Sequence, residues 1–366
     1  MKIADVKIHG VIVPMRPGVV HSPGVEDKLC APDPVSGRSL NFWEFPKWII
    51  EIEADNGLVG LGEPRRGDLY GPLKRYADML IGKRLIDLPV GNLPLPHGDR
   101  YESYIVYEAF EMAMLDLLGK HLEVPVWHLL GGKLLDHVPI HFWMGRMTAD
   151  ETARRTQIAV EMNFHAAYMK CALEDPIAER VRALREVAPH FSIVLDPNER
   201  FENPAGAVRV ARSLESFDRI VFESPVPQHR LDWYVRLRKK IPQPIALHLA
   251  SLGELWAALR LDAADYYNLL GPLKEFTEWA RLAAAAGCPP WRGTGIDLGI
   301  RDMSSVHAAA AAGCNFTNDI VGHMLREDDL IVEPIAFDDG CLVVPNGPGL
   351  GVELDRDALA RYRADI

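Results

Sequence analysis

The chain has little cysteine and no closely spaced cysteine pair. It contains five cysteines in 366 residues, and no two of them form a C-x-x-C motif. An odd number of scattered cysteines is typical of reduced thiols, because disulfide frameworks use paired cysteines in oxidising compartments. We therefore expect an intracellular, cytoplasmic protein without a disulfide framework.

Long apolar runs and basic runs are absent as well. No run is long enough to span a bilayer, and the sequence opens with alternating residues from Lys2 to Ile8 instead of a signal h-region. The 40 Lys and Arg residues against 51 Asp and Glu give a net charge of −11, and they form no stripe of the kind that binds nucleic acid. We expect a protein that binds neither membranes nor nucleic acids.

Three short apolar runs between positions 193 and 248 each end on a residue able to bind a metal. These residues are Asp196, Glu223 and His248, and successive ones are separated by the length of a loop, a helix and a strand. Parallel strands with this spacing place their C-terminal ends on one rim, where (β/α)8 barrels carry their active sites. Two carboxylates and an imidazole there suit Mg2+ or Mn2+. The alternatives are a helix cap at Asp196 and a core histidine at His248.

The pattern divides the chain into three units. Residues 1–135 read as α+β, with a hairpin turn at 55–57 and a helical pattern from 101. The Gly- and Pro-rich stretch 17–45 is either a loop that covers a site or a surface excursion. In residues 136–330, strand-like ends recur between helical stretches, near Phe142, Lys170, Asp196, Glu223, His248, Leu270, Trp291 and Asn318. Eight such units favour a closed parallel barrel over an open sheet. We expect the tail, 331–366, to pack on the first unit.

These segments, in this order, resemble the enolase superfamily, in its mandelate racemase and muconate lactonizing group. The resemblance rests on Ala109 to Lys120, Val124 to Lys133, Ala167 to Lys170, Leu195 to Asn198, Phe222 to Pro225 and Pro348 to Asp355. It implies a modified (β/α)8 barrel with an α+β capping domain that the C-terminal segment completes. It implies Mg2+ at the third to fifth strand ends and proton abstraction next to the carboxylate of a small hydroxy acid or sugar acid. It also implies a homo-oligomer, a dimer or an octamer.

Carried over by position, Asp196 and Glu223 match the first two metal ligands of the family. His248 takes the place of the usual third acid, as in some sugar-diacid dehydratases of the family. The second strand end has Tyr168-Met169-Lys170 where racemases of the family have Lys-x-Lys. Lys170 and a divalent cation would both favour phenolate, so we expect Tyr168 to be the general base and Lys170 its partner. The alternative is that Tyr168 only donates a hydrogen bond.

The polar residues expected to bind substrate are Asn198, Arg292, Thr294, His21 and Arg65. The sixth and seventh strand ends offer Asn268 and Arg292-Gly293-Thr294 in place of the family's Lys or His, although Asp297 is close in sequence. Racemisation by two bases needs proton donors on both faces of the carbanion. We therefore expect a metal-dependent lyase that dehydrates a hydroxy acid to a 2-keto acid. The alternatives are a racemase, epimerase or cycloisomerase of the same superfamily, or a member that binds an acid without chemistry.

Overall fold

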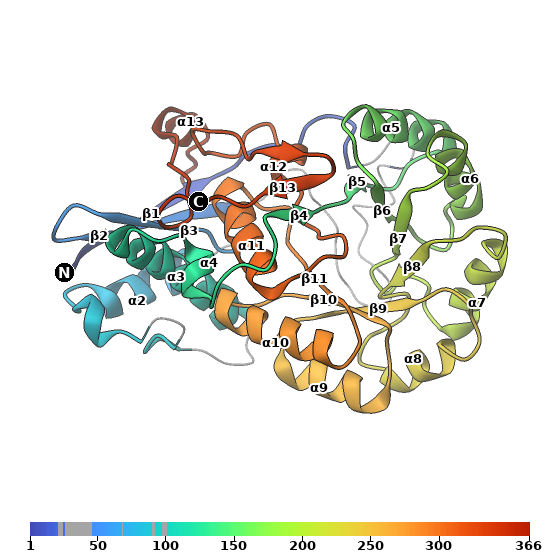
Figure 1. The fold of residues 1–366 in the computed structure, drawn as a ribbon. Coiled ribbons are helices and arrows are strands. Elements are labelled where there is room, and N and C mark those ends of the chain that lie inside the picture. The colour runs from blue at the N-terminus through green and yellow to red at the C-terminus, as the bar shows by residue number, and fades with distance from the viewer. Residues whose placement is uncertain (21–24, 26–45, 68, 90–91, 97–100) are drawn as a thin grey trace.

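The computed structural model describes residues 1–20, 25, 46–67, 69–89, 92–96 and 101–366. The first unit is a three-stranded antiparallel sheet covered by helices (Figure 1). Its elements are β1 (Ile3–Val11), β2 (Lys47–Ala54), β3 (Val59–Gly62), α2 (Tyr70–Leu80), the 3-10 turn Leu85–Asp87, α3 (Tyr101–Leu122) and α4 (Val126–Leu129). The predicted hairpin turn lies between β2 and β3, where Gly57 takes a φ of 84°.

The sheet can approach α3 closely because two positions of β3 are glycine. A Cβ on Gly60 would lie 2.1 Å from the Ala113 carbonyl oxygen, and one on Gly62 would lie 2.3 Å from that of Ala109. Any larger residue would have to push the helix away. The described part of α3 is buried from Tyr104 to Leu117, so the sheet and α3 form the core of the cap.

Beyond this unit, seven parallel strands follow one another in chain order around a ring, with helices outside them (Figure 1). The strands are β5 (Phe142–Met144), β6 (Ala166–Lys170), β7 (Ser192–Asp196), β8 (Ile220–Glu223), β9 (Ile245–Leu249), β10 (Tyr266–Leu269) and β11 (Pro290–Arg292). The helices are α5 (Ala149–Glu161), α6 (Ile177–Val187), α7 (Pro204–Ser213), α8 (Leu231–Leu237), α9 (Leu252–Leu261), α10 (Leu273–Ala285) and α11 (Gly299–Ala312).

A short segment around Asn318 closes the ring where the eighth strand was expected. Asn318 forms a parallel bridge with Ile140, and its N–H donates to the Pro139 carbonyl at 2.9 Å. On its other side, the Asp319 N–H donates to the Arg292 carbonyl at 2.9 Å. The predicted closed barrel is therefore confirmed, and its eighth strand is reduced to one bridge.

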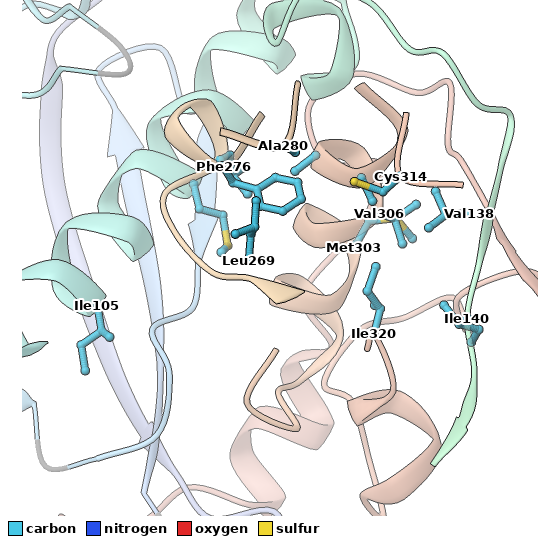
Figure 2. Close-up of a cluster of buried hydrophobic side chains, with 14 of the residues drawn as sticks. Ile105, Val138, Ile140, Leu269, Phe276, Ala280, Met303, Val306, Cys314 and Ile320 are labelled. Atoms are coloured by element: carbon cyan, nitrogen blue, oxygen red, sulfur yellow. The ribbon is translucent and has the colours of Figure 1, made fainter. Parts of the chain in front are cut away.

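Helix α11 is buried along its whole length between barrel and cap. It contacts α10 and β11 of the barrel and α4 and β3 of the cap. Figure 2 shows part of this core, where Leu269 of β10 lies beside Phe276 and Ala280 of α10, and Val306 of α11 lies near Cys314 and Val138. This packing fixes the cap on one side of the barrel.

The last segment returns to the cap, as expected. After α12 (Gly322–Leu325), its elements are β12 (Phe337–Asp338), β13 (Cys341–Val343), which pairs with β4 (His137–Pro139), and α13 (Arg356–Arg361). Arg356 forms a bidentate ion pair with Glu51 of β2, and the Ala364 N–H donates to the Gly10 carbonyl at 3.0 Å. The stretch from Leu330 to Ala336 forms one bridge, from Ile331 to Leu354. The unit boundaries at 135 and 330 stay predictions.

Candidate active site

Polar side chains stand at the C-terminal ends of five neighbouring strands. Lys170 of β6 is in register with Asp196 of β7, and His248 of β9 with Asn268 of β10. Glu223 is the last residue of β8, between these two pairs. Side chains alternate between the two faces of a strand, so Tyr168, Val194, Val221 and Ala246 lie one layer below these residues and fill the barrel interior. Asp196, Glu223 and His248 therefore share one rim, as predicted.

Asp196 is a buried carboxylate with three hydrogen-bond donors. It accepts from the Tyr168 hydroxyl at 2.5 Å, from the Lys170 ammonium, and from the Asn198 N–H at 2.8 Å. Lys170 also donates to the Asn198 side-chain oxygen at 2.9 Å. Lys170 and Asn198 are thus brought together at Asp196, and Asn198 orients the ammonium group.

Glu223 is buried and shares one oxygen between two neighbours. His248 Nδ1 lies 3.1 Å from Oε1, and Asn268 Nδ2 donates to the same oxygen at 2.9 Å. Burial raises the pKa of Glu223, as does the nearby Asp196 carboxylate. The two carboxylates therefore repel each other, and a cation bound between them would offset this repulsion.

Two atoms of this group fit a cation. Glu223 Oε2 and His248 Nε2 are buried without a hydrogen-bond partner among the described residues. Carboxylate oxygens and imidazole are ligands for Mg2+ and Mn2+. Within the described ranges, however, no three His, Cys, Asp or Glu side chains are gathered closely enough to form a ready metal site. The donor chemistry fits the predicted ion, and binding would require these side chains to draw together.

The protein's own groups do not shift Tyr168 towards phenolate. Burial raises its pKa well above the usual value, and the Asp196, Glu223 and Asp319 carboxylates act in the same direction. Its hydroxyl donates to Asp196, so the group holds its proton. Lys170 lies on the same face one layer higher, and is the better candidate for the base.

Arg292 does not join the rim. The barrel interior is lined by Trp291, so strand alternation turns Arg292 outward, towards the helices and the cap. Its guanidinium donates to Glu108 of α3 at 3.0 Å and to the Gly271 carbonyl at 2.8 Å. Arg65 contacts the same Glu108 at 3.4 Å. Both arginines thus belong to a buried ion-pair network between cap and barrel, and Arg292 is not retained as a substrate-binding residue.

The remaining predicted residues are placed as follows. The Thr294 hydroxyl donates to the Asp319 carbonyl at the rim. Asp297 is paired with Lys47 at 2.7 Å and with Arg301 at 3.1 Å, in the same buried network as Arg292. His21 lies outside the described residues.

A second pair, His141 and Asp319, was not predicted from the sequence. His141 Nε2 lies 3.1 Å from Asp319 Oδ1, and its ring stacks on Tyr168 with centroids 4.5 Å apart. Burial raises the pKa of Asp319 to about 7 and lowers that of His141 to about 3. The pair comes from residues flanking the single closing bridge, where no apolar run marks a strand. The His141–Asp319 pair lies between β11 and β5 in the ring, and the His141 ring reaches Tyr168 of β6.

A closed parallel barrel with a cap, and with acidic residues at the ends of adjacent strands, defines a class of enzyme. Comparison with known proteins places the chain in this class. Residues 151–358 match the family described as enolase C-terminal domain-like. Residues 44–131 match the mandelate racemase/muconate lactonizing enzyme N-terminal domain. The chain belongs to the mandelate racemase/muconate lactonizing enzyme family of the enolase superfamily. Members of this superfamily bind Mg2+.

Individual relatives are similar in sequence to this chain over most of its length. Muconate cycloisomerase 1 of Rhodococcus opacus is 26% identical over 87% of this chain and 91% of its own length. D-galactarolactone cycloisomerase of Agrobacterium fabrum is 27% identical over 90% of this chain and 94% of its own length. Other relatives are named racemase or epimerase. An enolase structure from Thermobispora bispora, complexed with magnesium and formate, is 25% identical, with a TM-score of 0.80 over 99% of this chain and 92% of that one.

These relatives are enzymes acting on small acids, so the coarse prediction of an enzyme is confirmed. None of the helices in the described ranges is both long and apolar enough to cross a bilayer. The four cysteines that the structure describes are free. The cytoplasmic location and the dimer or octamer stay predictions.

Proposed function

We propose that this chain is an isomerase of the cycloisomerase type, which opens and closes a lactone or cyclic ester by reversible β-elimination next to a carboxylate. The observation that carries the proposal is that, among the described residues, the proton-transferring groups of the rim lie on one side. Lys170 stands at the end of β6, whereas β10, across the ring, presents Asn268, which is hydrogen-bonded to Glu223. One base on one face supports removal and return of a single proton, whereas racemisation calls for two opposed bases.

The chain's own residues account for the proton transfer. Lys170 first releases the proton of its ammonium group to solvent; the resulting amine takes the α-proton, and the C–H electrons form the new double bond as the β-oxygen leaves with its electron pair as a carboxylate. In the reverse direction, the carboxylate adds to the double bond and the Lys170 ammonium returns the proton to the α-carbon. Asp196 and Asn198 hold the Lys170 nitrogen in place for both directions.

Asp196, Glu223 and His248 would hold Mg2+ or Mn2+. When bound, the cation would stabilise the negative charge that develops on the substrate carboxylate as the α-proton is lost. Two features of the rim support this assignment: the mutual repulsion of Asp196 and Glu223, and the buried Glu223 Oε2 and His248 Nε2 without hydrogen-bond partners in the described part of the chain.

Dehydration of a sugar acid to a 2-keto acid is the second candidate. It uses the same removal of an α-proton, with water as the leaving group in place of a carboxylate. His248 at the third ligand position favours it, because some sugar-diacid dehydratases of the family resemble this chain there. The names of the relatives favour the isomerase, since they include cycloisomerases of muconate and of a sugar-diacid lactone.

A panel of diacids and their lactones, incubated with Mg2+ or Mn2+ in D2O and followed by NMR, tests the proposal. It should include muconate, muconolactone and sugar-diacid lactones. We expect interconversion of one lactone with its open acid and one deuterium at the α-carbon. A 2-keto product would instead establish the dehydratase, and inversion at the α-carbon would establish an epimerase. If the protein binds the metal but exchanges no α-proton of any acid in the panel, it is a family member that binds acids without catalysing a reaction.

A further inference from the structure

The hydrogen-bond ladder between β8 and β9 ends before it reaches His248. Glu223 pairs with Ala246, and the Ser224 N–H donates to the Ala246 carbonyl at 3.0 Å. Ser224 then takes a φ of 45°, so the chain turns away from β9. The backbone of His248 is thereby left without a main-chain neighbour on this side. Buried or half-buried backbone groups need such a partner, because an unmade hydrogen bond costs stability.

The side chain of Gln228 takes the place of that neighbour. The His248 N–H donates to Gln228 Oε1 at 2.7 Å, and Gln228 Nε2 donates to the His248 carbonyl at 2.9 Å. The Ser224 hydroxyl donates to the same Oε1 at 3.2 Å. A carboxamide has both an acceptor and donors, so one side chain satisfies both backbone groups of His248. Gln228 in effect continues β8 by one residue.

This contact links two of the proposed metal ligands. The loop that holds Gln228 begins at Glu223, whose Oε1 lies 3.1 Å from His248 Nδ1. One end of the loop therefore supplies a carboxylate, and the other end fixes the backbone that carries the imidazole. With Nδ1 turned to Glu223, the second ring nitrogen, Nε2, is the atom left for a cation.

We infer that Gln228 is a positioning residue that sets the place of the His248 imidazole relative to Glu223, and that metal affinity depends on it. The inference rests on the ligand set proposed above. Gln228 acts through the backbone of His248, so its effect differs from that of a ligand. Removing it leaves all three donors present but lets the end of β9 move. Partners of this kind typically account for 10- to 100-fold in metal affinity.

Gln228→Met tests this role, because methionine has a similar length and cannot make either hydrogen bond. Gln243→Met is the matched control: Gln243 also bonds a backbone carbonyl, that of Ala211 at 3.0 Å, but it lies before β9 begins. Mn2+ affinity is measured by electron paramagnetic resonance, and imidazole coordination by the 14N modulation in electron spin echo spectra. We expect Gln228→Met to weaken Mn2+ binding about tenfold and to diminish the 14N signal. Gln243→Met should change neither.

Circular dichroism and the melting temperature of each metal-free variant show that it folds. If Gln228→Met does not fold, Gln228→Asn replaces it, since asparagine keeps the amide but is too short to reach both groups, and the same two changes are expected. Wild-type Mn2+ affinity and an unchanged 14N signal in the folded variant would overturn the inference alone. A wild-type protein without any 14N signal, or a His248→Ala variant that binds Mn2+ normally, would overturn the proposed ligand set together with it.

Discussion

Lys170 and Asp196 stand opposite each other at the ends of β6 and β7, and the Lys170 ammonium donates to the Asp196 carboxylate. The pair joins the proposed base to the proposed metal ligand. Because the two side chains are held by neighbouring strands of a packed barrel, the strand register would set the distance between the base and a cation bound by Asp196. The pair therefore connects the two halves of the proposed chemistry, proton removal and charge stabilisation.

Lys170→Met should strongly slow α-proton exchange and leave metal binding unchanged. A positioned base contributes about 10²- to 10⁴-fold to such a step, so deuterium incorporation in D2O should fall by that factor. Mn2+ affinity should be retained, because Asp196, Glu223 and His248 are unchanged. Lys239→Met, a variant of a residue outside the barrel mouth, is the control. Exchange at the wild-type rate in Lys170→Met would exclude Lys170 as the base.

Tyr168→Phe should have a much smaller effect on exchange than Lys170→Met. Burial and the adjacent carboxylates hold the pKa of Tyr168 well above its usual range, so the phenol keeps its proton. Its loss removes one hydrogen bond to a carboxylate and should lower the free energy of unfolding by about 1–3 kcal/mol. Exchange rate and urea unfolding of the same preparation measure both effects. An exchange rate as low as that of Lys170→Met would restore Tyr168 as the base.

The residues at the rim could be predicted from the sequence wherever an apolar run marks the strand that precedes them. Asp196, Glu223 and His248 each end such a run, and the structure places all three on one edge. Asp319 and His141 were missed because the eighth strand is a single bridge, without a run to mark it. Gln228 could not be found either, because its contact with His248 depends on the turn at Ser224.

Arg292 and Tyr168 differ from expectation for other reasons. Arg292 was chosen for its charge at a strand end, although its neighbour Trp291 already occupies the inward-facing position. The alternation of side chains along the strand would have shown this, but only with the register of β11 known. For Tyr168, the sequence showed the nearby Lys170 but not the burial, and burial decides the direction of the pKa shift.

Lys47→Met should destabilise the protein strongly. The Lys47 ammonium lies 2.6 Å from Glu63 and 2.7 Å from Asp297, and all three side chains are buried between cap and barrel. Its removal leaves two buried carboxylates facing each other, which costs about 3–5 kcal/mol. Lys7→Met is the matched control, because Lys7 forms an exposed ion pair with Glu53 on the neighbouring strand. Chemical denaturation of both variants should separate them, and equal midpoints would contradict a stabilising role for the buried pair.

Glu111 should make the protein less stable as the pH rises towards 8. This buried residue of α3 accepts from the Leu273 N–H at 2.5 Å and so caps α10. Burial raises its pKa from about 4.5 to about 8. Between these two values the folded chain keeps the proton while the unfolded chain releases it, so the free energy of unfolding falls with increasing pH.

The measurement is the melting temperature of the wild type and of Glu111→Gln at intervals from pH 5 to pH 8. Glutamine keeps an acceptor for Leu273 but cannot ionise, so the variant should lose less stability than the wild type across this range. The difference between the two proteins isolates Glu111 from other titrating groups such as Asp319, whose pKa is also raised, to about 7. Parallel curves would mean that Glu111 does not titrate between these pH values, and that its proton does not contribute to the attachment of α10 to the cap.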